Sequence, residues 1–371
     1  MASLTIDGAV LAAAAHRADT VSSIAGIPID AAELIAGRVA LLRLAPAGTV
    51  SAGGATRLMA ARDGWCALTL ARADDVDAVP ALVEHDVVER DPWQTVRNRL
   101  RQSGVHEFAE RARLLGLPVG VLGETAPAAP TVRVCGRRET PGSLRDVLVA
   151  DLSSMWAGPL CGRLLAGAGA TVVKVESRRR PDGTRAGPRP FFDWVNAGKL
   201  SYAADFDEPE QLVRLLSVAD VVLESSRPAA LARRGLGPDI MPARDGRIWL
   251  QITGHGAAGE KAHWVAFGDD AAVSGGLVGG TAGAPTFCGD AIADPLTGLE
   301  AAAAVLDAHR RGGGEVITVA MAAVAAHYAA LPVAGDVDCT ATAFDPDRAA
   351  RLGEHNALVD RIVAERAVTA C

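Results

Sequence analysis

The sequence predicts an α/β fold, with a Rossmann-like parallel sheet domain that carries helices on both faces and a smaller α+β domain. Three observations lead to this prediction. Apolar runs of strand length recur between residues 146 and 253, helix-like segments separate the first three of them, and the 371 residues are 49% apolar and 22% charged. Strands that alternate with helices are typical of a parallel sheet, and this length and composition support two or three hydrophobic cores.

The strand-like runs are rich in β-branched residues. They are DVLVADL (146–152), TVVKVE (171–176), DVVLES (220–225) and RIWLQIT (247–253). Helices are expected at 158–166 and 209–218, with Gly167 and Gly169 forming the end of the first helix and the turn into the next strand. Ligands of such sheets bind beyond the carboxyl ends of the strands. The candidate positions are therefore 151–156, 176–180, 225–227 and 254–255.

The N-terminal part has a different character. Ala-rich helical segments precede a glycine-rich loop at 45–56, a strand is expected at 65–71 after the turn Arg62–Asp63–Gly64, and charged helical patterns run to Leu117. The segment before residue 146 is rich in proline and arginine and reads as a linker. We therefore divide the chain into a small unit at 1–125, a linker at 126–145, and a domain at 146–371 that ends in a C-terminal tail.

Composition excludes several classes of function. The net charge of −7 gives no basic face for nucleic acid. Six cysteines without a CxxC spacing predict no metal site and no disulfide framework, and they fit reduced thiols in the cytoplasm. The N-terminus shows no signal-peptide pattern. The uncharged run 316–335 is weakly hydrophobic and contains His327 and Pro332, so a buried helix is expected there rather than a membrane span.

The usual cofactor motifs are missing, since neither GxGxxG nor GxxxxGK[ST] follows a predicted strand. Arginines gather near the strand ends, at 178–180, 185, 189, 227, 233 and 234. They are consistent with solvated loops, or with a ligand rich in phosphate such as a nucleotide or coenzyme A, because guanidinium groups pair with phosphate.

Carboxylates supply the candidates for chemistry. Asp290 and Asp294 precede a helix expected at 296–309, where an aspartate can cap the helix or act as a nucleophile or base. Asp269 and Asp270 are adjacent, a pattern more typical of a solvated turn than of a catalytic pair. His255 and His263 are possible acid–base groups, although isolated histidines are more often surface or packing residues.

Several consecutive segments together resemble the family III coenzyme A transferases, which include formyl-CoA transferase and α-methylacyl-CoA racemase. The segments fall in the family's order over residues 146–361. They are VLVADLSSMWAGPLCGRLLAGAGATVVKVE, FFDWVNAGKLSYAADF, ADVVLESSRPAALARRGLG, IWLQITGHG, CGDAIADPLTGLEAAAAVLDAHRRGGGEVITVAM and RLGEHNALV.

The resemblance implies an acyl-CoA:carboxylate CoA-transferase whose nucleophile is Asp294, with Asp290 as the alternative. This carboxylate would attack an acyl-CoA thioester and pass through an aspartyl-CoA thioester. Coenzyme A and acyl-CoA would be substrates, with a small carboxylic acid as the second partner and no permanently bound cofactor. The implied CoA contacts are Ser154, Met155, Trp156, Ala157, Glu176, Ser177, Ser225, Ser226, Ala230, Arg233 and Arg234.

Departures from the family pattern keep other readings open. Formyl-CoA transferase has His and Gln at the positions of Ser154 and Trp156, so its specificity for small acids is not carried over. The racemases have Gly-His-Asp where FGDD stands, which places Asp269 at the histidine position. The alternatives are a racemase or epimerase that uses Asp294 with Asp269, and a CoA-binding homologue without turnover.

The order of the segments also departs from the family. SAGGATRLMAARDGWCALTLA resembles a part of the small domain that normally follows the aspartate region, so the N-terminal half looks rearranged. We expect both parts to pack as in the family, with residues 51–56 near Asp294 and glycines allowing close backbone approach. The resemblance further implies an interlocked homodimer.

Overall fold

A computed structural model gives the fold of residues 2–46, 48–85 and 91–369. Its centre is a seven-stranded sheet in the order β5-β13-β10-β9-β6-β7-β8, parallel except for the antiparallel edge strand β5. The strands are β5 Thr131–Val134, β6 Leu148–Asp151, β7 Thr171–Ser177, β8 Leu200–Ala204, β9 Val221–Glu224, β10 Ile248–Thr253 and β13 Glu315–Ala320. The predicted α/β class is confirmed, and the predicted strands correspond to β6, β7, β9 and β10.

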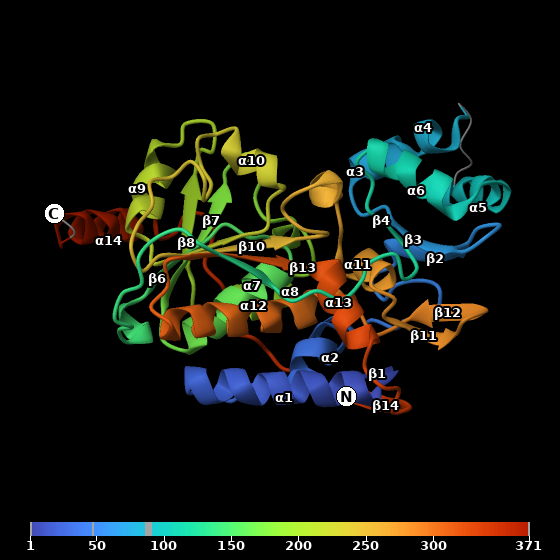
Figure 1. Cartoon of the computed structure of the whole chain (residues 1–371), viewed down its shortest axis with the longest axis horizontal. Coiled ribbons are helices and arrows are strands. Elements are labelled where there is room, and N and C mark those ends of the chain that lie inside the picture. Colours follow the sequence, from blue (N-terminus) through green and yellow to red (C-terminus); the bar gives the residue numbers. More distant parts are fainter. Residues whose placement is uncertain (1, 47, 86–90, 370–371) are drawn as a thin grey trace.

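Helices cover both faces of this sheet, as predicted (Figure 1). The helices around it are α7 Ala157–Gly167, α8 Arg189–Asn196, α9 Glu210–Val218, α10 Pro228–Ala232, α12 Ala293–Arg310, α13 Met321–Ala329 and α14 Asn356–Thr369. Alternate strand residues face opposite ways, because side chains of a strand have a period of two. Val149 packs with α7 and α12, whereas Leu148 packs with α9 and α14.

Residues 2–42 pack on the helices that cover one face of the large sheet. Strand β1 (Ala2–Asp7) pairs with β14 (Asp336–Ala341), and helix α1 (Gly8–Ala25) lies along α12 (Figure 1). Helix α2 (Ala31–Leu42) contacts α8 and β14, and its buried side chains belong to the same core as α7 and α12. These elements therefore share the core of the large sheet, although the predicted small unit included them. The division at 125 and 146 stays a prediction.

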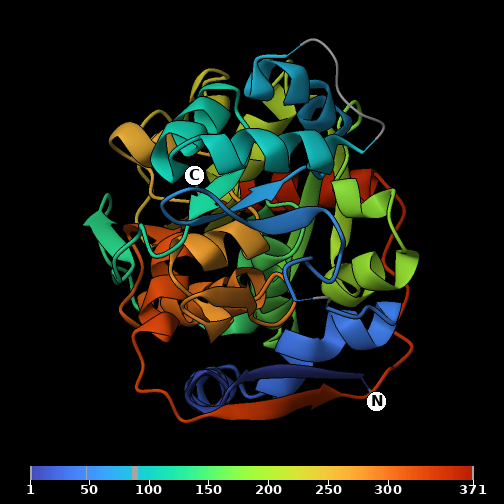
Figure 2. The same ribbon diagram turned by 90° about the vertical axis from the view of Figure 1, so that its right-hand side faces the viewer.

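A second core lies in the segment that begins at β2. The antiparallel sheet β2-β3-β4 carries four helices and forms a separate lobe (Figures 1 and 2). Its elements are β2 Thr56–Ala60, β3 Trp65–Thr69, α3 Ala73–Asp77, α4 Val79–Val83, α5 Pro92–Gln102, α6 Val105–Leu114 and β4 Val119–Val121. Helix α11 (Gly268–Ser274) of the C-terminal half packs on β3 and β4, and the hairpin β11–β12 (Val278–Thr281, Ala284–Phe287) lies beside it. Residues of both halves thus meet at α11.

Two sequence expectations need correction. The run 316–335 is not one buried helix, because most of β13 and all of α13 lie within it. An uninterrupted apolar run does not reveal by its period where a strand gives way to a helix. The predicted linker also contributes β5, which pairs with β13. In the described part of the chain, no helix is long and apolar enough to cross a membrane.

The tail motif around Asn356 covers the free edge of the sheet. Ala203 of β8 donates to Asn356 Oδ1 at 3.0 Å, and Asn356 Nδ2 donates to Ala203 O at 2.8 Å. Ser201 N donates to His355 Nδ1 at 3.1 Å. Edge strands present unpaired backbone groups, so these side chains supply the partners that another strand would provide.

Candidate active site

Asp294 lies in the first turn of α12, where it lines a cavity of about 200 Å³ at the carboxyl ends of the strands. The cavity runs between the turn after β6, the ends of β9 and β10, and α13. Its lining residues are Ser154, Met155, Ala157, Gly158, Ser225, Ser226, Arg227, Ile252, Thr253, Gly254, Ala262, Trp264, Val265, Ala266, Phe267, Asp294 and Met321. The capping role considered for Asp294 does not apply, because Ile292 is the N-cap residue of α12.

The surroundings of Asp294 favour its protonated form near neutrality. Burial raises the pKa of its carboxyl to about 7, with Asp269 adding to the rise, while Arg38 and the backbone N–H of Ala157 oppose it. Gly268 approaches the carboxyl so closely that a Cβ there would lie 2.4 Å from Asp294 Oδ2. A carboxyl with such a pKa can be an effective nucleophile or base while remaining partly ionised.

Arg38 is the cation of this cluster, and it comes from α2. Its Nη1 lies 2.7 Å from Oδ1 of the buried Asp290, and its guanidinium lies 5.4 Å from the ring centres of Trp156 and Phe191. Burial raises the pKa of Asp290 to about 6 even with Arg38 beside it. The pairing identifies Asp290 as the carboxyl that holds Arg38.

Asp269 and Asp270 do not form a solvated turn, contrary to the reading favoured by their spacing. Asp269 Oδ1 accepts from Ala291 N at 3.0 Å, and burial raises its pKa. Asp270 is fully buried, accepts from Phe267 N, and has a pKa raised by burial to about 8. Ala291 itself has a positive φ of 44°, an uncommon conformation for a residue with a Cβ.

The glycine-rich loop reaches the same cluster. Thr56, at the end of the loop, donates to Asp269 Oδ2 at 3.2 Å, and Ser51 also hydrogen-bonds Asp269. A Cβ on Gly53 would lie 2.9 Å from Nη2 of Arg38. Since Asp269 neighbours Asp294, these contacts agree with the expected position of residues 51–56 near Asp294.

Two buried ion pairs fix the turn between β6 and α7. Lys174 pairs with Asp182 at 2.7 Å and donates to Ser153 O, and both carboxylate oxygens of Asp182 accept from Met155 N at 3.2 and 3.3 Å. Lys199 pairs with Asp151 at 2.8 Å. Met155 has a φ of 73°, so this network holds a strained residue in the cavity wall.

The predicted CoA contacts separate into two groups. One group lines the cavity together with Asp294: Ser154, Met155, Ala157, Ser225 and Ser226. The other group lies outside its lining: Trp156, Glu176, Ser177, Ala230, Arg233 and Arg234. Glu176 is buried and pairs with Arg185 at 2.6 Å, and Arg234 pairs with Asp207 at 3.1 Å. The role of all these residues in binding CoA stays a prediction.

The sequence analysis missed residues that reach the site from distant positions in the sequence. Arg38, Thr69 and Asp182 have no local motif, and each meets the site only through the fold. Arg227 was noted only as one of the strand-end arginines, yet it is an exposed cation in the cavity lining. His255 and His263 are outside the lining.

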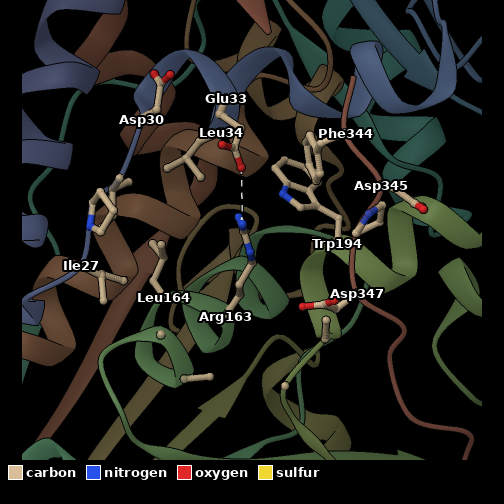
Figure 3. A pocket seen from close by; sticks show the side chains of 17 residues that line it. Ile27, Asp30, Glu33, Leu34, Arg163, Leu164, Trp194, Phe344, Asp345 and Asp347 are labelled. Carbon is tan, nitrogen blue, oxygen red and sulfur yellow. Dashed lines mark hydrogen bonds and ion pairs between the residues drawn. The ribbon is translucent and has the colours of Figure 1, made fainter. Parts of the chain in front are cut away.

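A second cavity, of about 550 Å³, lies between α2, α7, α8 and residues 344–347 (Figure 3). Arg163 points toward Glu33 at 3.4 Å, and Trp194 lies against Phe344. The remaining charged residues of the lining are Asp30, Asp345 and Asp347. Because acids outnumber the single arginine, this cavity is electrostatically unsuited to a ligand with several phosphates.

The comparisons with known proteins concern mainly the C-terminal half. The family described as CoA-transferase family III matches residues 144–358. The chain is 33% identical over 204 residues to succinate–glutarate CoA-transferase of Agrobacterium fabrum, which covers 48% of this chain and 50% of that protein. It is 34% identical over 197 residues to succinyl-CoA–D-citramalate CoA-transferase of Chloroflexus aurantiacus, with 48% and 49% covered.

Solved structures give a similar coverage. A crystal structure of a hypothetical protein from Mycobacterium tuberculosis is 32% identical, covers 50% of this chain and 57% of that one, and has a TM-score of 0.46. The chain spans about half the length of the curated relatives that it matches.

Proposed function

The chain belongs to the family III CoA-transferases, since this family matches residues 144–358. From this membership we propose that the protein is an acyl-CoA:carboxylate CoA-transferase with Asp294 as nucleophile. The observation that carries the proposal is the position of Asp294. Its carboxyl lines one cavity with the turn after β6 and with Ser225 and Ser226 after β9. Curated relatives named as CoA-transferases support the same reaction class.

The proposed reaction uses the carboxylate of Asp294 twice. It attacks the thioester carbonyl of an acyl-CoA, which breaks the C–S bond and gives a mixed anhydride and CoA thiolate. The thiolate then attacks the aspartyl carbonyl, giving an aspartyl-CoA thioester and the free acid. A second carboxylic acid reverses these steps and leaves as its CoA ester. Covalent catalysis divides the transfer into steps with lower barriers.

Residues around Asp294 have defined tasks in this proposal. The N–H of Ala157 at the start of α7 bonds the carboxylate, and Arg38 supplies a positive charge, so both favour the ionised nucleophile. Ser225, Ser226 and Arg227 would contact CoA, with Arg227 pairing with a phosphate. Among the described residues no cluster suited to a metal ion is present, and the proposal requires none.

The test is CoA exchange between a panel of acyl-CoAs and isotopically labelled free acids, followed by mass spectrometry. Wild type should transfer CoA to at least one labelled acid, and Asp294→Ala should not. Unchanged transfer by Asp294→Ala would reject Asp294 as nucleophile.

A racemase or epimerase is the second candidate, and the carboxyl Asp269 next to Asp294 favours it. Two acid–base groups are what removal and return of an α-proton on opposite faces requires. Uptake of deuterium at the α-carbon without acyl exchange would support this candidate. Tight CoA binding without either reaction would support a homologue that has lost turnover.

The assembly and compartment belong to the same proposal. We propose a homodimer, as the family resemblance implies, and a cytoplasmic location. Cys66, Cys135, Cys161, Cys288 and Cys339 are free thiols, which supports a reducing compartment. Sedimentation of the purified chain tests the dimer.

Gly268→Ala should impair CoA transfer strongly. Its Cβ would lie 2.4 Å from Asp294 Oδ2 and 2.3 Å from Ala291 O, so the nucleophile must move. A displacement of about 1 Å can cost about 100-fold in rate, and we expect a loss of this size in kcat. The control is Gly142→Ala, where a Cβ meets nothing within 4 Å. Equal activity of the two variants would contradict the close approach.

A further inference from the structure

We propose that Asp269 and Asp270 share one proton along a chain of two threonine hydroxyls, and that this chain stores the proton beside Asp294 while that carboxylate reacts. The chemical role rests on the proposed function of Asp294. The hydrogen-bond chain itself rests only on the geometry of α11, β2 and β3.

The chain of hydrogen bonds between Asp269 and Asp270 has three links. Thr56 Oγ1 lies 3.2 Å from Asp269 Oδ2, the two threonine hydroxyls lie 3.0 Å apart, and Thr69 Oγ1 lies 2.8 Å from Asp270 Oδ1. Thr56 and Thr69 face each other because they are paired residues of β2 and β3. Thr56, Thr69 and Asp270 are buried, so bulk water does not compete for the link between the two hydroxyls or for the link to Asp270. The link to Asp269 is partly buried.

A count of protons indicates that one of the two carboxyls, Asp269 or Asp270, must be protonated. Each hydroxyl has a single proton to donate, so two hydroxyls can supply only two of the three links. The third link needs a proton on Asp269 Oδ2 or on Asp270 Oδ1. If both carboxyls were ionised, one buried link would join two acceptors, which is unfavourable.

The other contacts of the two carboxyls cannot supply that proton. Ala291 N–H donates to Asp269 Oδ1 at 3.0 Å, and Phe267 N–H donates to Asp270 Oδ1 and Oδ2 at 3.1 and 3.2 Å. A backbone N–H keeps its proton. The hydroxyl of Ser51 hydrogen-bonds Asp269, but it takes part in none of the three links. The directions of the pKa shifts agree, since burial raises the pKa of both Asp269 and Asp270.

The shared proton can be transferred from Asp269 to Asp270 through the two threonine hydroxyls, without exchange with solvent. Asp269 donates to Thr56, the Thr56 proton passes to Thr69, and the Thr69 proton passes to Asp270; the reverse sequence restores the start. One negative charge remains on the pair throughout. The charged groups near Asp269 are Asp294, Asp290 and Arg38.

The position of the proton follows the charge of Asp294. While Asp294 is an ionised nucleophile, the proton lies on Asp269 and removes the repulsion between two neighbouring carboxylates. When Asp294 is acylated and neutral, the proton moves to Asp270. The two buried aspartates thus keep the local charge nearly constant through the reaction.

Asparagine at either end has an opposite effect on the pH profile. Phe267 N–H faces both carboxyl oxygens of Asp270, whereas Thr69 faces Oδ1. In Asp270→Asn we expect the amide oxygen to accept from Phe267 N–H at the Oδ2 position, with the amide nitrogen at the Oδ1 position donating to Thr69. Thr69 then donates to Thr56, and Thr56 to Asp269, which stays ionised beside Asp294. The acidic limb of the kcat/KM profile should therefore move up by about one pH unit. In Asp269→Asn the neighbour of Asp294 is neutral in every state, whereas wild type has an ionised Asp269 beside Asp294 while Asp294 is protonated. The variant therefore loses what favours protonated Asp294, and the limb should move down.

Thr69→Val is a second variant, which breaks the chain without changing either carboxyl and should also move the limb up. Thr318→Val is the control, because Thr318 of β13 donates to its paired residue Gln251 of β10, and neither residue lines the cavity. It should leave the limb in place. A downward shift in Asp270→Asn, as expected of a simple loss of negative charge, overturns the proposal.

A readout that does not depend on activity separates this proposal from the proposed function. In the Asp294→Asn background, on the alkaline side of neutrality, the infrared spectrum should contain the carbonyl band of a protonated carboxyl. Adding either Asp269→Asn or Asp270→Asn should remove it, because the amide supplies the third proton. Glu224 is another buried carboxyl with a pKa raised by burial, and its absorbance is common to all these variants, so the comparison is a difference spectrum. A difference spectrum without loss of carbonyl absorbance on adding Asp270→Asn overturns the shared proton, whether or not the protein transfers CoA.

Discussion

Asp294→Asn should abolish CoA transfer and make the protein more stable above neutral pH. The amide is nearly isosteric but is no nucleophile, and we expect a loss of at least about 1,000-fold in kcat. The pKa of Asp294 is raised to about 7 by burial. A carboxyl whose pKa is raised in the folded state contributes stability at acidic pH, which is lost as pH rises through the folded value.

The stability difference should therefore grow with pH. Asparagine stays neutral, so the melting temperature of Asp294→Asn should exceed that of wild type increasingly between about pH 4 and pH 7, and by a constant amount at higher pH. The measurements are thermal denaturation over this range and the CoA exchange assay. Asp19→Asn, at an exposed position of α1, is the control and should change neither. A variant that melts below wild type at pH 8 contradicts the account of the buried carboxyl.

Asp182→Ala should have the largest effect on stability among the positions considered. It leaves Lys174 buried without its carboxylate and removes the acceptor of Met155 N–H. Breaking one partner of a buried pair costs about 3–5 kcal/mol. The freed turn should also raise KM for acyl-CoA, because Ser154 and Met155 line the cavity.

The control is Asp220→Ala, because Asp220 lies at the amino ends of β6 and β9, away from the cavity. Asp220 accepts from Leu148 N at 2.8 Å and pairs with Arg244 and Arg366, but it is partly exposed. Asp220→Ala should cost less stability, since surface ion pairs contribute little, and should leave KM unchanged. Chemical denaturation and steady-state kinetics provide the comparison. Equal effects of the two variants would show that Asp182 has no special influence on the turn.

The central β–α–β unit could be predicted from the sequence because its signals are local. The apolar runs that became β6 and β7 end in polar residues, and Gly169 at φ 103° forms the turn between α7 and β7. Strands β8 and β13 were missed. The first, LSYAA, contains no β-branched residue, and the second continues directly into α13 without a polar break. Patterns of this kind locate elements only where the period changes or a turn residue intervenes.

The site could be predicted only in part, because its surroundings are assembled over long distances in the chain. The resemblance predicted Asp294 as the nucleophile, and the strand-end rule indicated Ser154 and Ser225; the structure places all three in the lining of one cavity. Arg38 pairs with Asp290 across 252 positions, and Thr69 bonds Asp270 across 201 positions. Without knowledge of these long-range partners, the adjacent Asp269 and Asp270 are interpreted as a solvated turn. Their burial follows from packing between the two halves of the chain.

The most direct test is mass spectrometry of the protein quenched during turnover with an acyl-CoA and an acceptor acid. We expect the peptide that contains Asp294 to carry CoA as a thioester that hydroxylamine removes, and we expect no adduct in Asp294→Asn. A CoA adduct on another residue, or transfer that proceeds without any adduct on Asp294, would contradict the assignment of the nucleophile.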